Sequence, residues 1–402
     1  FHHMQTAKTF GLAPGGEPTV DFAALMGRTR KVVGGLVKGV GMLLKARKVD
    51  VVHGWGTLTG PKSIAVKTDD GEQTVEAENI IIATGSAPVE LPFAPFDGKR
   101  IISTDDATKA EELPKSILVV GGGVIGVEFA TVYSELGVEV IVLEMLPRLV
   151  PPLDEDAAKE IFKSLKKRRV RIKTGTKITA LKADGDGVVA EIEGGDPVKA
   201  DVALVAVGRR PVTKGFGLDA VGIEMDGRII EVDEKCQTSV PGIYAIGDCA
   251  AALQYAHVAS RMGIVAADNA TGHDAHDRLD VVPAGVYTHP EVAGVGMTEQ
   301  QAQDAGRAVK VSRFPYQASG MAQAYGETAG MVKIIADEET GEILGALIIG
   351  QHATDAIHEI TLAMRNELTV EEIAETIHAH PTFSEAVGEA AEGWLGLAVH
   401  VP

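Results

Sequence analysis

The stretch "SILVVGGGVIGVE" (116–128) constrains the fold of this chain more than any other. Its apolar start predicts a buried strand, and the apolar periodicity that follows predicts a helix. Between the two, Gly121, Gly123 and Gly126 form a G-x-G-x-x-G motif. The first glycine permits a tight turn, the second admits a pyrophosphate against the backbone, and the third lets helix and strand pack closely. The motif therefore predicts a dinucleotide-binding βαβ unit, with an ordinary glycine-rich turn as the alternative.

The next predicted strand, "VEVIVLE", ends at Glu144, which is 144 − 121 = 23 positions after Gly121. A carboxylate at this place holds a ribose 2′-hydroxyl and repels a 2′-phosphate. The spacing favours NAD over NADP, although Arg148 lies close enough in sequence to leave NADP open.

Two further stretches, "IIIATGSAPVE" (80–90) and "ALVAVGRRPVT" (203–213), share a pattern of apolar strand, glycine turn and proline. The second follows a G-x-G-x-x-G motif, whereas residues 1–79 contain none. We therefore expect an opening βαβ unit of about 30 or more residues upstream of residue 1. A third stretch, "GIYAIGD" (242–248), places Asp248 at a strand end, where it could bind a ribityl or ribose hydroxyl of a second cofactor or form a surface turn.

Composition narrows the class of protein. A chain of 402 residues can form two or three domains, and its net charge of −18 argues against a nucleic-acid partner. A membrane span needs about 18 consecutive apolar residues, and no apolar run of this sequence approaches that length. We therefore expect no membrane insertion. Cys236 and Cys249 are too far apart for a C-x-x-C centre and suit a reducing cytoplasm, the expected location. No metal site is predicted.

Residues 21–48 predict an amphipathic helix with a basic face. We interpret it as a helix packed on a sheet, with lipid or partner binding as the alternative.

Near the C-terminal end, "HAHPTFSEA" (378–386) places His380 close to Glu385. A histidine beside a carboxylate is typical of a general acid–base pair. Thr382 and Glu385 also fit a helix capping box, in which case His380 would be a surface residue before a helix.

Taken together, six motifs identify a resemblance that extends in order along the whole chain: "ATGS", "VVGGGVIGVE", "AVGRRP", "TSVPGIYAIGD", "YTHPEVAGVG" and "HAHPTFSEA". The chain resembles the dihydrolipoyl dehydrogenase family of the pyridine nucleotide–disulfide oxidoreductases. The resemblance implies an α/β fold with two Rossmann-like dinucleotide-binding domains, for FAD and NAD, and a C-terminal α+β dimerisation domain. The implied domains are a split FAD domain (1–115 and 237–280), an NAD domain (116–236) and an interface domain (281–402). The strand ending at Thr84 should then pair with the strand ending at Ile246.

The resemblance also implies a reaction. Protein-bound dihydrolipoamide would be oxidised to lipoamide through a redox-active disulfide and FAD, with hydride passing to NAD⁺. His380 would be the acid–base and Glu385 would orient it, both acting across a homodimer interface on the other subunit's disulfide. The disulfide and the FAD fingerprint would precede residue 1. The implied partner is the lipoyl domain of a 2-oxo acid dehydrogenase or glycine cleavage complex.

Matching the family's motifs residue by residue gives two sets of expected cofactor contacts. Those to FAD are Gly56, Thr84, Gly85, Ser86, Asp248, Gln254, Tyr255, Ala256 and His257. Those to NAD are Gly121, Gly122, Gly123, Val124, Ile125, Gly126, Val127, Glu128, Glu144, Ile178 and Gly208. One departure is "LQYAH" (253–257), where the family usually has Met-Leu-Ala-His.

Three alternatives remain open. Glutathione reductase shares the scaffold but usually carries basic residues where Glu144 stands, and mercuric reductase has a C-terminal cysteine pair that the tail "GLAVHVP" lacks. The third alternative is a redox-inactive FAD- or NADH-binding subunit.

Overall fold

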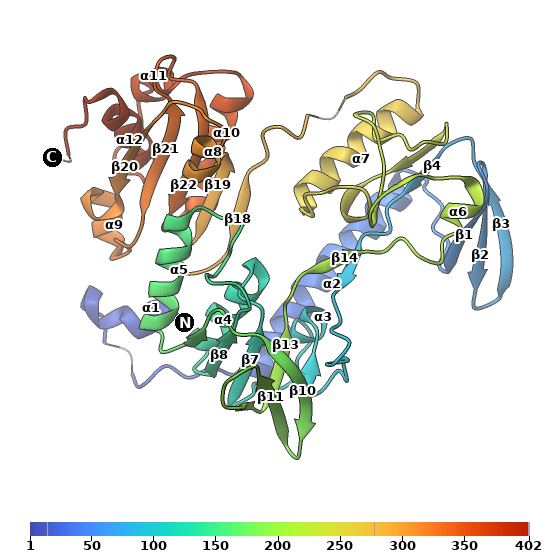
Figure 1. Cartoon of the computed structure of the whole chain (residues 1–402), viewed down its shortest axis with the longest axis horizontal. Coiled ribbons are helices and arrows are strands. Elements are labelled where there is room, and N and C mark those ends of the chain that lie inside the picture. Colours follow the sequence, from blue (N-terminus) through green and yellow to red (C-terminus); the bar gives the residue numbers. More distant parts are fainter. Residues whose placement is uncertain (14, 277, 401–402) are drawn as a thin grey trace. The chain divides into compact units, whose positions relative to one another are not determined.

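The computed structural model describes residues 1–13, 15–276 and 278–400. The chain divides into two compact units (Figure 1), which are described separately. Unit 1 comprises Phe1–Val20, Glu90–Gly208 and Asp280–Pro402, and unit 2 comprises Asp21–Val89 and Arg209–Leu279. Among the described residues, no helix combines the length and the apolar character needed to cross a membrane.

The first part of unit 1 is a five-stranded parallel sheet in the order β6-β13-β7-β8-β9. Its strands are β6 (Ile101–Ile102), β13 (Val202–Val205), β7 (Ser116–Val120), β8 (Glu139–Leu143) and β9 (Arg171–Lys173). The helices α4 (Val124–Glu135) and α5 (Glu155–Lys167) follow β7 and β8, and a three-stranded antiparallel sheet is formed by β10 (Ile178–Asp184), β11 (Gly187–Ile192) and β12 (Val198–Ala200). The predicted βαβ unit at 116–144 is confirmed.

Strand β7 shows why this sheet is stable. Successive side chains of a strand point to opposite faces, and both faces of β7 are covered. Ile117 and Val119 belong to a cluster with residues of α4 and α5, whereas Leu118 and Val120 pack with residues of the β10–β12 sheet. All four side chains are at most 4% exposed.

The second part of unit 1 is a five-stranded antiparallel sheet in the order β18-β19-β22-β21-β20. Its strands are β18 (Ala284–Val286), β19 (Val292–Gly296), β22 (Ile343–Ile349), β21 (Met331–Asp337) and β20 (Val309–Pro315). The helices of this part are α8 (Glu299–Asp304), α9 (Gly320–Tyr325), α10 (Ala353–Arg365), α11 (Val370–Glu375) and α12 (Glu385–Leu395). Every residue of the central strand β22 is buried.

A buried lysine joins the two parts of unit 1. Lys333 on β21 is 2% exposed, and its Nζ lies 3.0 Å from both Oδ1 and Oδ2 of Asp154, the N-cap of α5. The same Nζ is 3.0 Å from Asp156 and 2.6 Å from Glu299. Burial acts to lower the pKa of Lys333, but the three carboxylates outweigh it and raise that pKa. The ammonium group is therefore buried and fully paired.

Unit 2 contains α2 (Phe22–Ala46), α6 (Leu218–Val221), α7 (Ala256–Ala270) and a sheet of β1 (Trp55–Gly60), β2 (Ser63–Thr68) and β3 (Gly71–Glu76). Unit 2 also has three short strand pairs. Strand β4 (Ile80–Ile82) runs parallel to β17 (Ile243–Ala245), β5 (Ser86–Pro88) is antiparallel to β14 (Arg209–Pro211), and β15 (Met225–Asp226) is antiparallel to β16 (Ile229–Ile230). The expected pairing of the strands that lead to Thr84 and Ile246 is confirmed.

Helix α2 was expected at 21–48 and lies at Phe22–Ala46, capped by the Asp21 side chain, which accepts from the Ala24 N–H. Its packing differs from the expectation, because Met26 is its one buried residue. Apolar side chains along it, such as Leu36 and Leu43, are about two-thirds exposed (67% and 66%).

The compact units also divide the chain at places other than the expected domain boundaries. Strand β6 lies within the segment assigned to the FAD domain, yet it pairs with β13 in the sheet of β7. Residues 209–236 were assigned to the NAD domain and lie in unit 2, where β14 pairs with β5. Strand pairing over long sequence separations causes both differences. The assignment of each domain to a cofactor remains a prediction.

Candidate active site and cofactor-binding regions

The three glycines of the motif between β7 and α4 differ in the space that surrounds them. Gly121 has φ +105°, and a Cβ there would lie 2.5 Å from the Ala206 carbonyl oxygen. A Cβ on Gly126 would lie 2.0 Å from the Gly121 carbonyl oxygen, so α4 can approach the turn only with glycine at this position. A Cβ on Gly123, the N-cap of α4, would meet nothing within 4 Å. The open space at Gly123 is where a pyrophosphate could approach the start of the helix.

Glu144 lies at this turn, as the spacing predicted, and is 7% exposed. Its Oε2 accepts from the Gly122 N–H at 2.5 Å and its Oε1 from the Leu146 N–H at 2.7 Å. The sequence did not reveal this bracing of the turn. A carboxylate has about four acceptor sites, so these two bonds leave capacity for a ribose hydroxyl. Arg148, in contrast, donates from Nη2 to the carbonyls of Pro151 and Leu153, at 2.5 and 3.0 Å.

The remaining residues expected to contact NAD differ in how accessible their side chains are. Val127 is fully buried in the core, so its side chain is unavailable to a nucleotide, while Val124 and Ile125 are partly buried against the same cluster. Glu128 accepts from the Tyr287 N–H at 2.9 Å, and burial raises the pKa of its carboxyl. Ile178 begins β10 and packs partly buried against the other core cluster.

Gly208 has φ +115°, and a Cβ there would meet nothing within 4 Å. Its backbone conformation, rather than a close approach, accounts for the glycine at this position.

In unit 2, the β5–β14 pairing assembles a cluster of expected FAD contacts. Ser86 Oγ donates to Asp248 Oδ2 at 2.5 Å. Arg209 donates from Nε to Ser86 Oγ and from Nη2 to the Ser86 carbonyl, each at 2.8 Å. Thr84 Oγ1 donates to the Val212 carbonyl at 2.6 Å. Ser86 and Asp248 are separated by 162 positions in sequence, so the fold brings them together. Arg209 was not predicted, although it lies inside the quoted "AVGRRP" motif.

The other expected FAD residues lie at the start of α7 and elsewhere in unit 2. Gln254 Nε2 lies 3.5 Å from the Asp248 carbonyl, and Ala256 is the first residue of α7. The rings of Tyr255 and His257 are stacked with centroids 5.2 Å apart. Two glycines complete the set: Gly85 has φ +67°, and Gly56 belongs to β1 in the separate three-stranded sheet.

His380 and Glu385 form the expected pair within one chain. His380 Nδ1 lies 2.7 Å from Glu385 Oε1, and the imidazole side chain is 79% exposed. Burial opposes ionisation of Glu385, but the Thr382 N–H and His380 hold the pKa of its carboxyl below the ordinary value. When Nδ1–H donates to the carboxylate, the other ring nitrogen, Nε2, is an acceptor.

Of the two hydrogen bonds in the predicted capping box, one is present. Glu385 Oε2 accepts from the Thr382 N–H at 2.7 Å, as such a box requires. However, α12 begins at Glu385 with Ser384 as its N-cap, and Thr382 Oγ1 donates to the Ala379 carbonyl instead. Glu385 therefore holds the loop with one oxygen and His380 with the other, so the two interpretations are compatible.

A second histidine–carboxylate pair lies beside the first. His378 Nε2 is 2.8 Å from Glu359 Oε1 on α10, and its Nδ1 is 2.9 Å from the Thr376 carbonyl. The bond to Glu359 raises the pKa of His378 against the effect of burial. No local motif predicts this pair, because Glu359 lies 19 positions upstream in another helix.

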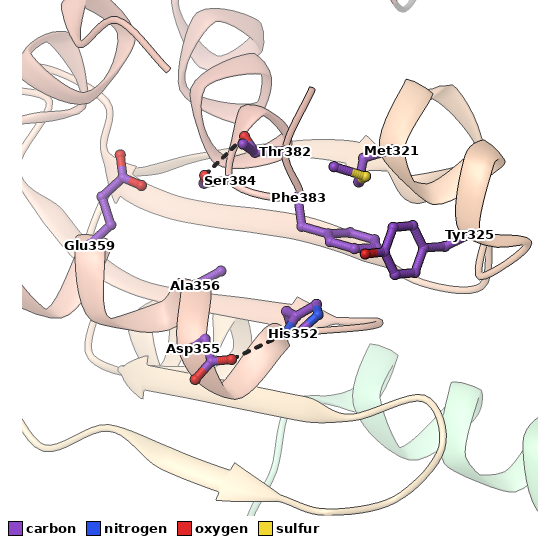
Figure 2. Close-up of a pocket in the computed structure, with 9 residues that line it drawn as sticks. All are labelled: Met321, Tyr325, His352, Asp355, Ala356, Glu359, Thr382, Phe383 and Ser384. Atoms are coloured by element: carbon purple, nitrogen blue, oxygen red, sulfur yellow. Dashed lines mark hydrogen bonds and ion pairs between the residues drawn. The ribbon is translucent and has the colours of Figure 1, made fainter. Parts of the chain in front are cut away.

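The loop before α12 also lines a pocket of about 460 Å³ in unit 1 (Figure 2). Its residues are Met321, Tyr325, His352, Asp355, Ala356, Glu359, Thr382, Phe383 and Ser384. The rings of Tyr325 and Phe383 meet edge to face at 5.4 Å, and His352 Nδ1 lies 3.1 Å from Asp355. The pocket is therefore mainly aromatic on one side and carries carboxylates on the other.

Residues 2–263 match the family described as pyridine nucleotide-disulphide oxidoreductase, and residues 282–391 match the dimerisation domain of the same family. The chain belongs to this family. As a pyridine nucleotide–disulphide oxidoreductase it uses FAD and NAD(H), and it carries the family's C-terminal dimerisation domain.

Several characterised members of the family are similar to the chain over most of its length. Mitochondrial dihydrolipoyl dehydrogenase of Pisum sativum is 40% identical over 95% of this chain and 78% of its own length. A dihydrolipoyl dehydrogenase of Bacillus subtilis is 41% identical over 100% of this chain and 87% of its own. Leghemoglobin reductase of Glycine max is 42% identical over 92% of this chain and 72% of its own.

Solved structures agree with the fold. The crystal structure of LpdA from Mycobacterium tuberculosis superimposes with a TM-score of 0.91 at 30% identity, covering 98% of this chain and 86% of that one. The HOCl-induced flavoprotein disulfide reductase RclA from Escherichia coli gives a TM-score of 0.86 at 27% identity, covering 93% and 86%. The expected combination of α/β dinucleotide-binding regions with a dimerisation domain is confirmed.

Proposed function

We propose that this pyridine nucleotide–disulphide oxidoreductase is a dihydrolipoyl dehydrogenase, which oxidises protein-bound dihydrolipoamide to lipoamide with NAD⁺ as the final acceptor. The observation that carries the proposal is the exposed His380 imidazole, held 2.7 Å from Glu385. The similarity to dihydrolipoyl dehydrogenases from plants and bacteria supports the choice of substrate.

His380 would act as the base toward the substrate dithiol. A thiol with a pKa of about 8.5 must lose its proton before it attacks a disulfide, and an imidazole can accept that proton near neutral pH. Glu385 would keep Nε2 directed outward and stabilise the imidazolium that forms. FAD, held by the residues assigned below, would supply the two-electron chemistry that links the family's redox-active disulfide to NAD⁺.

For the pyridine nucleotide, we assign the open turn at Gly123 to the pyrophosphate and Glu144 to the ribose. The fit rests on the absence of protein atoms within 4 Å of a Gly123 Cβ position and on the acceptor capacity that remains on Glu144. Val127 would contribute through its backbone, since its side chain is buried.

For FAD, we assign the polar cluster of Ser86, Asp248 and Arg209. Asp248 would accept a hydroxyl of the ribityl chain or ribose, and the bonds from Ser86 and Arg209 fix its surroundings. The segment 254–257 would line the flavin.

We also propose a subunit arrangement and a protein partner. His380 would serve the disulfide of the partner subunit in a homodimer, and the lipoyl domain of a 2-oxo acid dehydrogenase or glycine cleavage complex would deliver the dithiol. The buried free thiol of Cys249 suits a reducing compartment such as the cytoplasm.

The test is His380→Gln in the FAD-loaded holoenzyme. Dihydrolipoamide oxidation should fall by about 10²–10⁴-fold, the usual contribution of a positioned base. NADH oxidation with an artificial acceptor should stay unchanged, because that hydride transfer needs no imidazole on the dithiol side. Unchanged dihydrolipoamide turnover would return His380 to a surface role, and equal loss of both activities would indicate a folding defect.

Glu385→Gln is the companion variant. An amide can still orient the imidazole but stabilises imidazolium less, so the loss in turnover should be smaller than that of His380→Gln. A silent Glu385→Gln variant would mean that Glu385 only supports the loop.

A further inference from the structure

We propose that His2, His289 and Glu327 form a binding site for a divalent transition-metal ion of the zinc type. The three residues lie in unit 1 and come from segments distant in sequence. His2 begins α1 (His2–Thr6), His289 lies between β18 and β19, and Glu327 follows α9. The sequence predicted no metal site, because no short ligand spacing connects these residues.

The donor atoms are already close to a coordinating arrangement. His2 Nε2 lies 3.1 Å from Glu327 Oε1, and His289 Nε2 lies 3.0 Å from Glu327 Oε2. One atom from each residue lies within 4.8 Å of the other two. Ligands at about 2.0–2.2 Å from a tetrahedral zinc ion are separated by about 3.3 Å, so small side-chain rotations suffice.

The surroundings of His289 fit a metal ligand. Its Nδ1 lies 3.4 Å from Glu135 Oε1, and Arg168 Nη2 holds the same oxygen at 3.1 Å. Metal-binding histidines commonly donate the other ring N–H to a carboxylate, which fixes the tautomer and leaves one nitrogen for the ion. The side chains of His289 and Glu327 are 25% and 16% exposed, so the ion would be partly shielded and still reachable.

The ligand types select the class of ion. Two imidazoles with one carboxylate suit Zn²⁺ and its neighbours in the first transition row, whereas Ca²⁺ and Mg²⁺ prefer oxygen ligands throughout. Three protein ligands leave a fourth position for water or a small anion. The ion would tie α1 to two distant segments of unit 1.

The competing explanation is an ion pair without metal. The bonds from Glu135 and Glu327 raise the pKa of His289 to about 9, so a proton occupies this site at neutral pH. An ion must displace that proton, which weakens binding by about 100-fold at pH 7 relative to a fully deprotonated site. A measurement near pH 8 reduces this competition.

The test is a Co²⁺ titration of the holoenzyme at pH 8, after alkylation of accessible thiols. We expect one ion per chain, the intense visible absorption of four-coordinate cobalt, and a higher melting temperature in proportion to occupancy. His2→Ala and Glu327→Gln should each weaken binding by at least about 10–100-fold.

The matched control is His3→Ala. His3 neighbours His2 in sequence, and their rings lie 6.0 Å apart, but His3 is not one of the three ligands. The site would be supported if His3→Ala bound Co²⁺ with unchanged affinity while His2→Ala and Glu327→Gln lost that affinity. Equal loss in His2→Ala and His3→Ala would indicate adventitious binding to a histidine pair. The absence of saturable binding, or retention of binding in Glu327→Gln, would overturn the proposal.

Discussion

At the scale of single residues, Glu144 braces the turn after β7 and is also the residue that we propose for the nucleotide ribose. Its position at the end of β8 was predictable from spacing, whereas its bonds to the Gly122 and Leu146 N–H groups depend on the shape of the turn. The carboxylate is therefore fixed before any nucleotide arrives, which lowers the cost of ordering it on binding.

Replacing Glu144 with Ala should weaken NADH binding more than NADPH binding. Loss of a charge-assisted hydrogen bond costs about 1.5–3 kcal/mol, or about 10–150-fold in affinity. Titration of both nucleotides against the wild type and the variant measures the difference. A wild type that already prefers NADPH would show that Glu144 does not bind the 2′-hydroxyl. Melting temperature should fall in parallel, since the Gly122 N–H loses its acceptor.

The His378–Glu359 pair predicts a pH-dependent contribution to stability. Glu359 raises the folded-state pKa of His378 above the ordinary 6.5, so folding favours the protonated form. The contribution is then complete below pH 6.5 and disappears as the pH rises through the raised pKa. Urea unfolding of the wild type and His378→Gln between pH 6 and 9 should show a stability difference that shrinks with increasing pH. A difference independent of pH would mean that packing, and not the charge, accounts for the role of His378.

Residues recognised by local spacing were found more readily than residues that depend on the fold. The glycines at 121–126 and the His380–Glu385 pair lie within short stretches, so composition and spacing predicted them. Arg209 and Glu359 act on partners 123 and 19 positions away, and their roles appear only when strands and helices are placed. Motifs record chemistry that is local, whereas tertiary contacts do not leave a periodic signal in one sequence.

At the scale of elements, the β7–α4 connection depends on two glycines for different reasons. A Cβ on Gly126 would overlap the Gly121 carbonyl, whereas a Cβ on Gly123 would meet no protein atom. One glycine serves packing of the helix, and the other keeps space at the helix start.

Gly126→Ala should therefore reduce stability, by about 1–3 kcal/mol for forced overpacking. Gly123→Ala should leave stability nearly unchanged but weaken NADH, because the methyl group would occupy the approach of the pyrophosphate. Chemical denaturation and nucleotide titration of both variants separate the two effects. Identical behaviour of the two variants would contradict distinct roles for the glycines.

Prediction of elements from the sequence was successful where the apolar pattern was long and had clear ends. The helix at 22–46 lies within one or two residues of its expected bounds of 21–48. Packing was harder to predict than helix formation, since α2 buries Met26 alone. An amphipathic pattern shows that a helix has an apolar face but does not identify what covers it.

At the scale of the whole molecule, residues 282–391 form a dimerisation domain by family membership. Ile377 lies in this domain immediately before the His378 and His380 loop and is 96% exposed. Single exposed apolar residues are common on protein surfaces, so Ile377 is chosen for a test because of its place in the dimerisation domain beside the His380 loop.

We expect the holoenzyme to sediment as a homodimer at micromolar concentration, and Ile377→Asp to shift it toward monomer. Val132→Asp on α4 is the control, since Val132 is also apolar and 49% exposed but lies outside the dimerisation domain. If Ile377→Asp remained dimeric, Ile377 would lie outside the subunit contact. A fully active monomer would exclude catalysis by His380 across subunits.

The buried Lys333 affects whether the two parts of unit 1 can be expressed separately. Its ammonium group belongs to the dimerisation sheet, but Asp154 and Asp156 come from the helix that follows β8. Cutting the chain near residue 280 and expressing the C-terminal piece alone would remove two of the three carboxylates that pair with the Lys333 ammonium, and would leave Glu299 as its remaining carboxylate partner. Val292 and Ile349 would lose part of their core at the same time. The nucleotide-binding and dimerisation parts of unit 1 therefore depend on each other. Recombination that exchanged one part for that of another protein would also have to replace Lys333.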